Sequence, residues 1–207
     1  MTKERESKIR SQIIVGSLLI ISGICFSCGK LIFNNITKYK EELKIESFFE
    51  NKTPTPKTIN INKANNKSNA SQNEYVAVVE IPSINLKRGL VSKDSPLNNI
   101  KYNISILPES DTPDSVDGNV ILASHSGNTR VAFFKDLYKL KLSEYVYIYY
   151  DKYKYTYEII EIDNQEKTGT ISIKNANYPT LILTTCNQQD KNKQLVISAK
   201  LIDKNVY

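Results

Sequence analysis

Residues 145–160 read Tyr145-Val-Tyr-Ile-Tyr-Tyr-Asp-Lys-Tyr-Lys-Tyr-Thr-Tyr-Glu-Ile-Ile160, and this stretch decides the fold class of the 207-residue chain. Its tyrosines and β-branched residues predict two strands, because such side chains pack well on a pleated, half-buried surface. The Asp151-Lys152 pair between the two runs predicts a tight hairpin turn. We therefore expect an antiparallel β-hairpin at the centre of the folded part.

Strand-like runs continue on both sides of this hairpin. Apolar and β-branched residues gather in four further segments, which are Tyr75–Ile81, Asn119–Ala123, Thr180–Thr184 and Gln194–Ile202. Val131–Leu140 instead has apolar residues at helix-like spacing. Strands at short intervals with few helices are typical of a closed or nearly closed β-barrel. We expect a mainly β fold, a closed β-barrel with short helices, formed by residues 74–207.

The N-terminal part of the chain has a different character, with no charged side chain in residues 12–29. Eighteen helical residues reach about 27 Å, close to the thickness of a membrane's hydrocarbon core. Residues 1–11 form a basic tail, which favours a cytoplasmic N-terminus. Its cations are Lys3, Arg5, Lys8 and Arg10. We expect residues 12–33 to be one transmembrane helix in the cell membrane, in contact with lipid, with the β domain outside the cell.

Other interpretations of the apolar run are weaker. A cleaved signal peptide would need an Ala-x-Ala-like site after the run, and the sequence has none. A lipoprotein cysteine at Cys25 would need a small residue where Ile24 stands. The Cys25-x-x-Cys28 pair has the spacing of a redox motif, but we expect it to be inert inside a membrane helix.

Residues 34–73 are expected to link the anchor to the β domain. Residues 34–50 are charged with scattered apolar positions, which favours a short helix. Residues 51–73 contain Thr-Pro-Thr-Pro and an Asn-, Lys- and Ser-rich run, which cannot bury a core. This second part is therefore predicted to be a flexible tether.

The charge balance bears on the partners. The formal net charge is +6, which suits an anionic surface such as a membrane or a cell wall. No basic helix and no mixed aromatic and basic run stands out, so nucleic acid is not expected as a partner.

Two strand-like runs end in residues with catalytic chemistry. His125, the only histidine, ends Gly118-Asn-Val-Ile-Leu-Ala-Ser-His125. Cys186, the only cysteine outside the apolar run, ends Thr180-Leu-Ile-Leu-Thr-Thr-Cys186. Thiol catalysis needs a thiolate and a nearby group that gives and takes protons. The two residues are therefore the candidate catalytic pair, against the alternative of an inert buried thiol.

These features together resemble the sortases, the cysteine transpeptidases of Gram-positive bacteria. The resemblance covers residues 75–202 and rests on four segments, Ile81-Pro-Ser-Ile-Asn-Leu86, Ala123-Ser-His125-Ser-Gly-Asn128, Phe134-Lys-Asp-Leu-Tyr-Lys-Leu140 and Leu183-Thr-Thr-Cys186. The separation of 61 positions between His125 and Cys186 argues against the class B pattern. The lack of an apolar segment after residue 203 argues against the pilus-building type with a C-terminal anchor.

The resemblance implies a reaction and its partners. Cys186 would attack the Thr–Gly bond of an LPXTG-like sorting signal at the C-terminus of a surface protein, forming a thioester. An amine of a peptidoglycan precursor or of a pilin would then take the acyl group. His125 would protonate the leaving amine and deprotonate the incoming one.

The sequence departs from the sortase pattern at two positions. Ile182 stands where the motif Thr-Leu-x-Thr-Cys begins with threonine. The family places an arginine at the start of the last strand, where this sequence has Gln194. Charge-assisted donors are about twice as strong as neutral ones, and losing one oxyanion donor costs about a hundredfold in rate. Arg130 is the other cation considered for this role, while Lys193 is expected on the opposite face of the strand.

Two functional hypotheses follow. In the first, the chain is an active sortase in which Gln194 or Arg130 replaces the arginine, or in which Thr185 or backbone N–H groups hold the substrate carbonyl. In the second, it is a degenerate sortase-like domain that binds peptides without turnover. A papain-like peptidase is disfavoured because its cysteine precedes its histidine.

No cofactor and no metal ion are expected. Calcium is the one ion considered, because carboxylate oxygens are its usual ligands. The acidic residues concerned are Glu158, Glu161, Asp163 and Glu166. A solvated charged edge is the favoured interpretation of this group.

Overall fold

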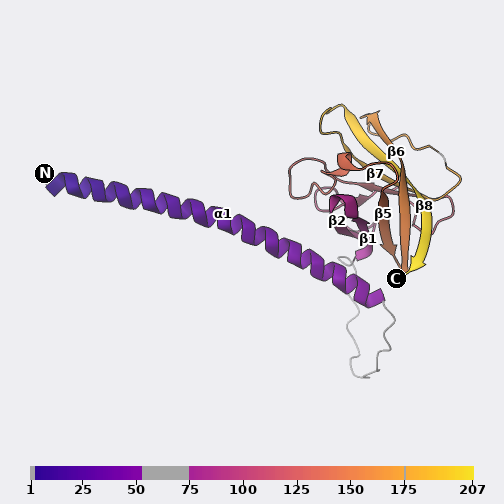
Figure 1. The fold of residues 1–207 in the computed structure, drawn as a ribbon, viewed down its shortest axis with the longest axis horizontal. Helices are drawn as coiled ribbons and strands as arrows, with labels where there is room; N and C mark the ends of the chain where they lie inside the picture. The colour runs from indigo at the N-terminus through magenta and orange to yellow at the C-terminus, as the bar shows by residue number, and fades with distance from the viewer. Residues whose placement is uncertain (1–2, 53–74, 175) are drawn as a thin grey trace, which may run out of the picture. The chain divides into compact units, whose positions relative to one another are not determined.

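The computed structural model describes residues 3–52, 75–174 and 176–207 (Figure 1). Its contacts divide the chain into two compact units, Met1–Leu43 and Lys44–Tyr207. The predicted tether at residues 51–73 lies almost entirely outside the described residues, and the predicted domain boundaries stay predictions.

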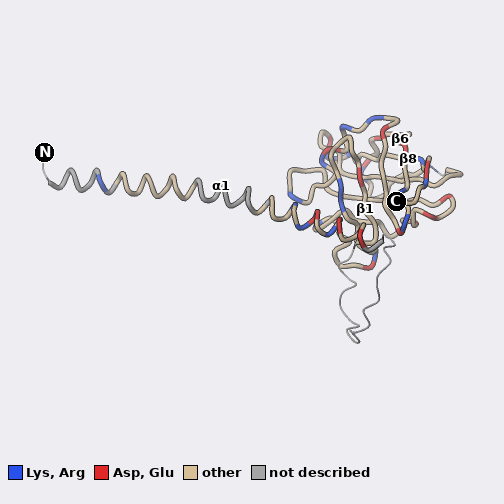
Figure 2. The backbone as a smooth tube through the Cα atoms, turned by 60° about the horizontal axis from the view of Figure 1, so that its bottom comes forward, with Lys and Arg blue, Asp and Glu red and all other residues tan. Residues whose placement is uncertain are grey.

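One helix, α1, runs through Lys3–Lys52. Its C-terminal part carries residues of both charge signs, whereas the described residues of its middle part carry none (Figure 2). Within the described part of the chain, no helix has the length and hydropathy needed to cross a membrane. The transmembrane helix predicted at residues 12–33 is therefore not supported by this finding. The side chains of residues 24–32 in that span lie outside the described residues.

In the described part of the chain, eight strands form a single sheet. They are β1 Tyr75–Ile81, β2 Leu86–Val91, β3 Ser105–Ile106, β4 Asn119–Ala123, β5 Tyr145–Tyr150, β6 Tyr153–Glu166, β7 Thr180–Cys186 and β8 Lys193–Val206. Their hydrogen-bonded order is β2-β1-β5-β6-β8-β7-β4-β3. The β4–β7 pair is parallel and the other pairs are antiparallel. Two short 3₁₀ helices, η1 Pro82–Ile84 and η2 Leu137–Lys139, complete the domain.

The predicted hairpin is confirmed. β5 and β6 pair in register from Tyr145 with Glu158 to Tyr150 with Tyr153, which leaves Asp151-Lys152 as the turn. Asp151 has a φ of 54°, in the left-handed region that aspartate tolerates better than most residues. The two-residue connection fixes the register, so the alternating tyrosines fall on fixed faces of the sheet.

The barrel is nearly closed rather than closed, which corrects the prediction in one respect. No ladder joins β2 to β3 within the described strands. Asn103 bridges the two edges instead: its Nδ2 donates to the Gly89 carbonyl (2.9 Å), and its Oδ1 accepts from Arg88 Nε (2.9 Å). A side-chain amide offers a donor and an acceptor together, so one buried asparagine replaces part of a ladder.

The helix-like apolar spacing at Val131–Leu140 corresponds to consecutive turns and the 3₁₀ helix η2 rather than to an α-helix. Backbone N–H groups here bond three residues back, as Lys135 does to the Ala132 carbonyl and Leu137 to the Phe134 carbonyl. Buried Phe134 and Leu137 still face the core. Apolar residues spaced by three satisfy this tighter turn as well as an α-helix, so spacing alone could not separate them.

The strand β7 is buried on both faces. Leu181 and Leu183 point into the barrel core, whereas Ile182 packs on the outer face with Ile121 and Val196. The outer cluster is covered by Ile171 and other residues of the segment between β6 and β7. A strand buried on both faces has little freedom to move, and it presents its last residue, Cys186, at a fixed place.

Candidate active site

The parallel strands β4 and β7 bring the two predicted catalytic residues to one edge of the sheet. The register pairs Ala123 with Thr184, and beyond it the Ser124 N–H donates to the Thr184 carbonyl (3.3 Å). His125 lies two residues beyond Ala123, and Cys186 lies two residues beyond Thr184. Both residues therefore stand at the same end of two adjacent parallel strands, and their catalytic roles stay predictions.

Three hydrogen bonds hold the segment that carries His125. The Thr185 hydroxyl donates to the Ser124 carbonyl (2.7 Å) in a buried position. The Phe134 N–H donates to the His125 carbonyl (3.1 Å). Gln188 Nε2, in the loop after β7, donates to the Ser126 carbonyl (2.6 Å). The bonds from Thr185 and Gln188 tie the residues on either side of His125 to the end of β7 and the loop after it, and the bond from Phe134 holds His125 itself.

The bond of Thr185 bears on its predicted role as an oxyanion donor. A threonine hydroxyl has one proton to donate, and here that proton is used on the Ser124 carbonyl. Thr185 is also buried. In this geometry Thr185 positions the histidine segment, and its predicted contact with substrate stays a prediction.

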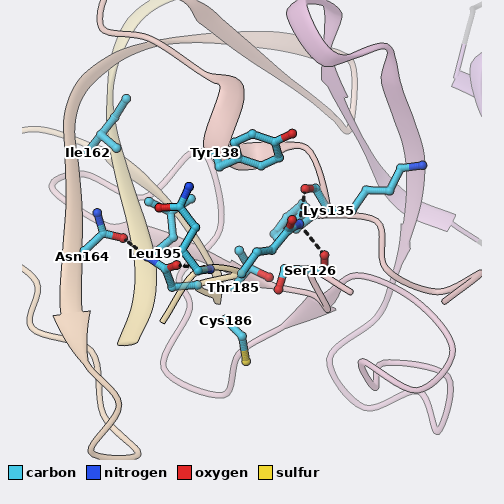
Figure 3. A pocket seen from close by; sticks show the side chains of 12 residues that line it. Ser126, Lys135, Tyr138, Ile162, Asn164, Thr185, Cys186 and Leu195 are labelled. Carbon is cyan, nitrogen blue, oxygen red and sulfur yellow. Dashed lines mark hydrogen bonds between the residues drawn. The ribbon is translucent and has the colours of Figure 1, made fainter. Parts of the chain in front are cut away.

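A cavity of about 380 Å³ opens beside Cys186. It is lined by Ser126, Phe134, Lys135, Tyr138, Ile162, Asn164, Thr185, Cys186, Asn187, Gln188, Gln189 and Leu195. Figure 3 shows Tyr138 and Ile162 on one side and the Cys186 sulfur at the other edge, directed away from them. The mixture of apolar side chains and amides suits an extended peptide, which offers both kinds of surface.

The Cys186 thiol has a cationic neighbour that the sequence did not indicate. Lys167 Nζ lies 3.4 Å from Cys186 Sγ, within hydrogen-bonding distance of sulfur. Lys167 follows the last residue of β6, and its side chain is exposed, whereas Cys186 is half-buried. Nothing in the sequence separates this lysine from the others, because the contact depends on the β6–β8 ladder.

Gln194 is the direct cross-strand partner of Cys186. Its Nε2 donates to the Thr170 carbonyl (2.6 Å) and to the Glu166 carbonyl (3.5 Å). A primary amide has two N–H donors, and both are used on backbone oxygens here. In this geometry the Gln194 amide holds the segment between β6 and β7. Its predicted role as an oxyanion donor stays a prediction.

Arg130, the other cation considered from the sequence, is exposed. It lines a separate cavity of about 280 Å³ together with residues such as Ile84 and Phe133. Among the described residues, those lining the cavity beside Cys186 do not include Arg130. The two cavities share Lys135, and the predicted role of Arg130 stays a prediction.

The acidic edge considered for calcium is partly engaged in ion pairing. Glu161 pairs with Lys174, and this hydrogen bond, reinforced by the carboxylate charge, raises the pKa of Lys174. Within the described ranges, no three His, Cys, Asp or Glu side chains gather as a metal site.

Comparisons with known proteins bear on the fold and the family. A family model described as "Sortase domain" matches residues 79–202. Sortase D5 from Clostridium perfringens, a transpeptidase, is 22% identical with a TM-score of 0.58, over 79% of this chain and 98% of that one. Sortase A from Listeria monocytogenes is 19% identical with a TM-score of 0.55, over 64% and 90%. The pilus island 1 sortase C2 of group B Streptococcus is 21% identical with a TM-score of 0.55, over 63% and 76%. No curated protein matches the sequence.

Proposed function

The chain belongs to the sortase family, and we propose that it is a membrane-anchored cysteine transpeptidase that acts on an LPXTG-like sorting signal. The observation that carries the proposal is the parallel pairing of β4 and β7. It supports a catalytic pair of His125 and Cys186, because both residues stand at the same end of these two strands. The matched structures include sortases of the A, C and D types, so the proposal names no subclass.

In the first half-reaction, the Cys186 thiolate attacks the carbonyl carbon of the Thr–Gly bond. A carbon–sulfur bond forms, and the carbon–nitrogen bond of the peptide breaks. The leaving glycine nitrogen takes a proton from His125 and departs as a neutral amine. A thiolate suits this step because it is both a good nucleophile and a good leaving group.

In the second half-reaction, an amine of a peptidoglycan precursor or of a pilin attacks the thioester carbon. The new carbon–nitrogen bond forms, the carbon–sulfur bond breaks, and the amine's surplus proton passes to His125. Cys186 returns to the thiolate, so both residues end as they began. General acid–base catalysis of this kind is worth about a hundredfold to ten-thousandfold in rate.

Membrane anchoring through residues 12–33 is part of the proposal. It is supported by the uncharged run at residues 12–29 behind the basic tail at residues 1–11. The N-terminus would then be cytoplasmic and the sheet outside the cell, where sorting signals of surface proteins are exposed.

The test is thioester capture. The full-length chain in detergent micelles is incubated with a panel of sorting-signal peptides, and intact mass spectrometry looks for an acyl adduct that maps to Cys186. An added amine should discharge the adduct and appear in the peptide product. The Cys186→Ala variant is the control and should show no adduct.

A second function is favoured by one observation, the neutral Gln194 with both amide donors engaged. It is a sortase-like domain that binds peptides without turnover. Peptide binding by fluorescence anisotropy with no adduct on Cys186, for every peptide of the panel, would favour this alternative and contradict the transpeptidase.

A further inference from the structure

We propose that Lys167 is a catalytic residue that stabilises the Cys186 thiolate, and that Gln194 is the residue that positions it. The inference rests on the proposed thiol chemistry of the same site. Lys167 touches the reacting sulfur, and Gln194 acts through Lys167.

The contact itself is direct. Lys167 Nζ lies 3.4 Å from Cys186 Sγ. An ammonium group has only donors, so the N–H points to sulfur. A positive charge at this distance favours the charged form of the thiol over the neutral form. The exposed position of Lys167 means that water and salt weaken this interaction without abolishing it.

The backbone around Lys167 is fixed to β8. The last pair of the β6–β8 ladder joins Glu166 to Lys193. The Lys167 N–H then donates to the Asn192 carbonyl (2.7 Å). Lys167 is the first residue of the segment between β6 and β7, and these two contacts fix its backbone. The side chain therefore extends from a fixed Cα position.

Gln194 holds the same segment from the side of the thiol. It is the cross-strand partner of Cys186, and its amide donates to the carbonyls of Glu166 and Thr170. Those two residues flank Lys167 in the chain. A single side chain thus ties the segment carrying the cation to the strand position beside the nucleophile.

The chemistry needs a positive charge that stays in place. Negative charge starts on the sulfur and moves to the substrate carbonyl oxygen when the carbon–sulfur bond forms. That oxygen lies two bonds from the sulfur, and Lys167 carries three donors on a flexible stem. Lys167 keeps its proton throughout, so proton transfer remains with His125.

Other ionisable groups lie on the segments around Cys186, and the test must separate them. They are His125 after β4, Lys135 and Tyr138 in the cavity lining, Glu166 at the end of β6, Asp190 and Lys191 in the loop after β7, and Lys193 on β8. Among the described contacts, Lys167 is the group whose charged atom touches the sulfur.

The test measures the pH midpoint of Cys186 alkylation by iodoacetamide in the full-length chain, with peptide mapping to separate Cys186 from Cys25 and Cys28. No substrate is needed. Lys167→Gln should slow alkylation at neutral pH about threefold to tenfold and move the midpoint to higher pH than in the wild type. Lys167→Arg should retain the wild-type midpoint.

The matched control is Lys191→Gln, at an exposed lysine in the loop between Cys186 and Gln194. It removes the same charge from the same region, and its midpoint should equal that of the wild type. Raising the salt concentration from about 0.05 M to 1 M should raise the wild-type midpoint and leave Lys167→Gln nearly unmoved, because salt screens exposed pairs. The salt titration of the unaltered chain requires no variant to fold.

Gln194→Leu tests the positioning role. It should raise the midpoint by less than Lys167→Gln does, and it should have no effect in the Lys167→Gln background. Independent shifts that add in the double variant would overturn the role assigned to Gln194.

Equal midpoints for Lys167→Gln and Lys191→Gln at low salt would overturn the role assigned to Lys167. Failure of the proposed function looks different: no peptide would acylate the wild-type chain, while the alkylation midpoints would still report on the Lys167 contact. In an active enzyme, Lys167→Gln should also slow single-turnover acylation about threefold to tenfold.

Discussion

Thr185→Val removes one hydroxyl at the junction of the nucleophile strand and the histidine segment. The Thr185 hydroxyl donates to the Ser124 carbonyl (2.7 Å), and Ser124 directly precedes His125. Valine has nearly the same shape and cannot donate. The substitution therefore tests one hydrogen bond with little change in packing.

The expected cost follows from burial. Thr185 and Ser124 are only 7% and 5% exposed, so water cannot easily replace the lost donor. A buried hydrogen bond contributes about 0.5–1.5 kcal/mol net, and an unsatisfied buried partner costs about 1–3 kcal/mol. We expect a loss of about 1–2 kcal/mol in the free energy of unfolding. For a domain of this size the melting temperature should fall by roughly 3–8 °C.

The adjacent Thr184→Val is the matched control. Thr184 is 8% exposed, and its hydroxyl makes no hydrogen bond to another residue in the described part of the chain. The same chemical change should therefore alter stability by less than about 0.5 kcal/mol. Urea denaturation followed by circular dichroism gives both values with the same slope.

The catalytic consequence is measured separately. A looser His125 segment should slow single-turnover acylation about tenfold in Thr185→Val at a temperature where the variant remains folded, because small displacements of catalytic groups are costly. Equal stabilities of the Thr184→Val and Thr185→Val chains would refute the reasoning. An unchanged acylation rate in a destabilised Thr185→Val chain would show that the bond stabilises the fold without positioning the histidine.

Four further predictions concern the site and the topology. Cys186→Ala should abolish the acyl adduct in intact mass spectra while the melting temperature stays within about 2 °C, and peptide turnover at the wild-type rate would exclude thiol catalysis. His125→Gln should slow acylation at least about a hundredfold in single-turnover kinetics, and a rate within threefold of wild type would remove it from the mechanism. Arg130→Ala should leave the acylation rate within about twofold of the wild-type rate, because Arg130 lines a second cavity. A tenfold loss would indicate that Arg130 fills the role of the arginine that the family places on the last strand. Protease treatment of intact cells should digest residues 74–207, and digestion only after lysis would contradict the proposed topology.

The β class and much of the strand pattern could be predicted because the side-chain period and the tight turn are local properties. The 145–160 hairpin has both, and its register follows from a two-residue connection. The spacing at Val131–Leu140 did not distinguish an α-helix from the observed series of turns, because apolar residues spaced by three fit both. The sequence also did not predict that the barrel stays open between β2 and β3. There the Asn103 side chain bonds to Arg88 and Gly89 of β2, and side-chain periodicity within one strand carries no information on such a contact between distant segments.

The sequence by itself determined the candidate nucleophile and its acid–base partner, since His125 is the only histidine and Cys186 the only cysteine outside the apolar run. Only the tertiary structure decided which cation faces the thiol. Lys167 reaches Cys186 because β6, β8 and β7 are adjacent in the sheet, and Gln194 uses its amide on backbone oxygens of a distant segment. Charge acts over a few ångströms in space regardless of sequence separation, so the electrostatics of the site were set by strand order.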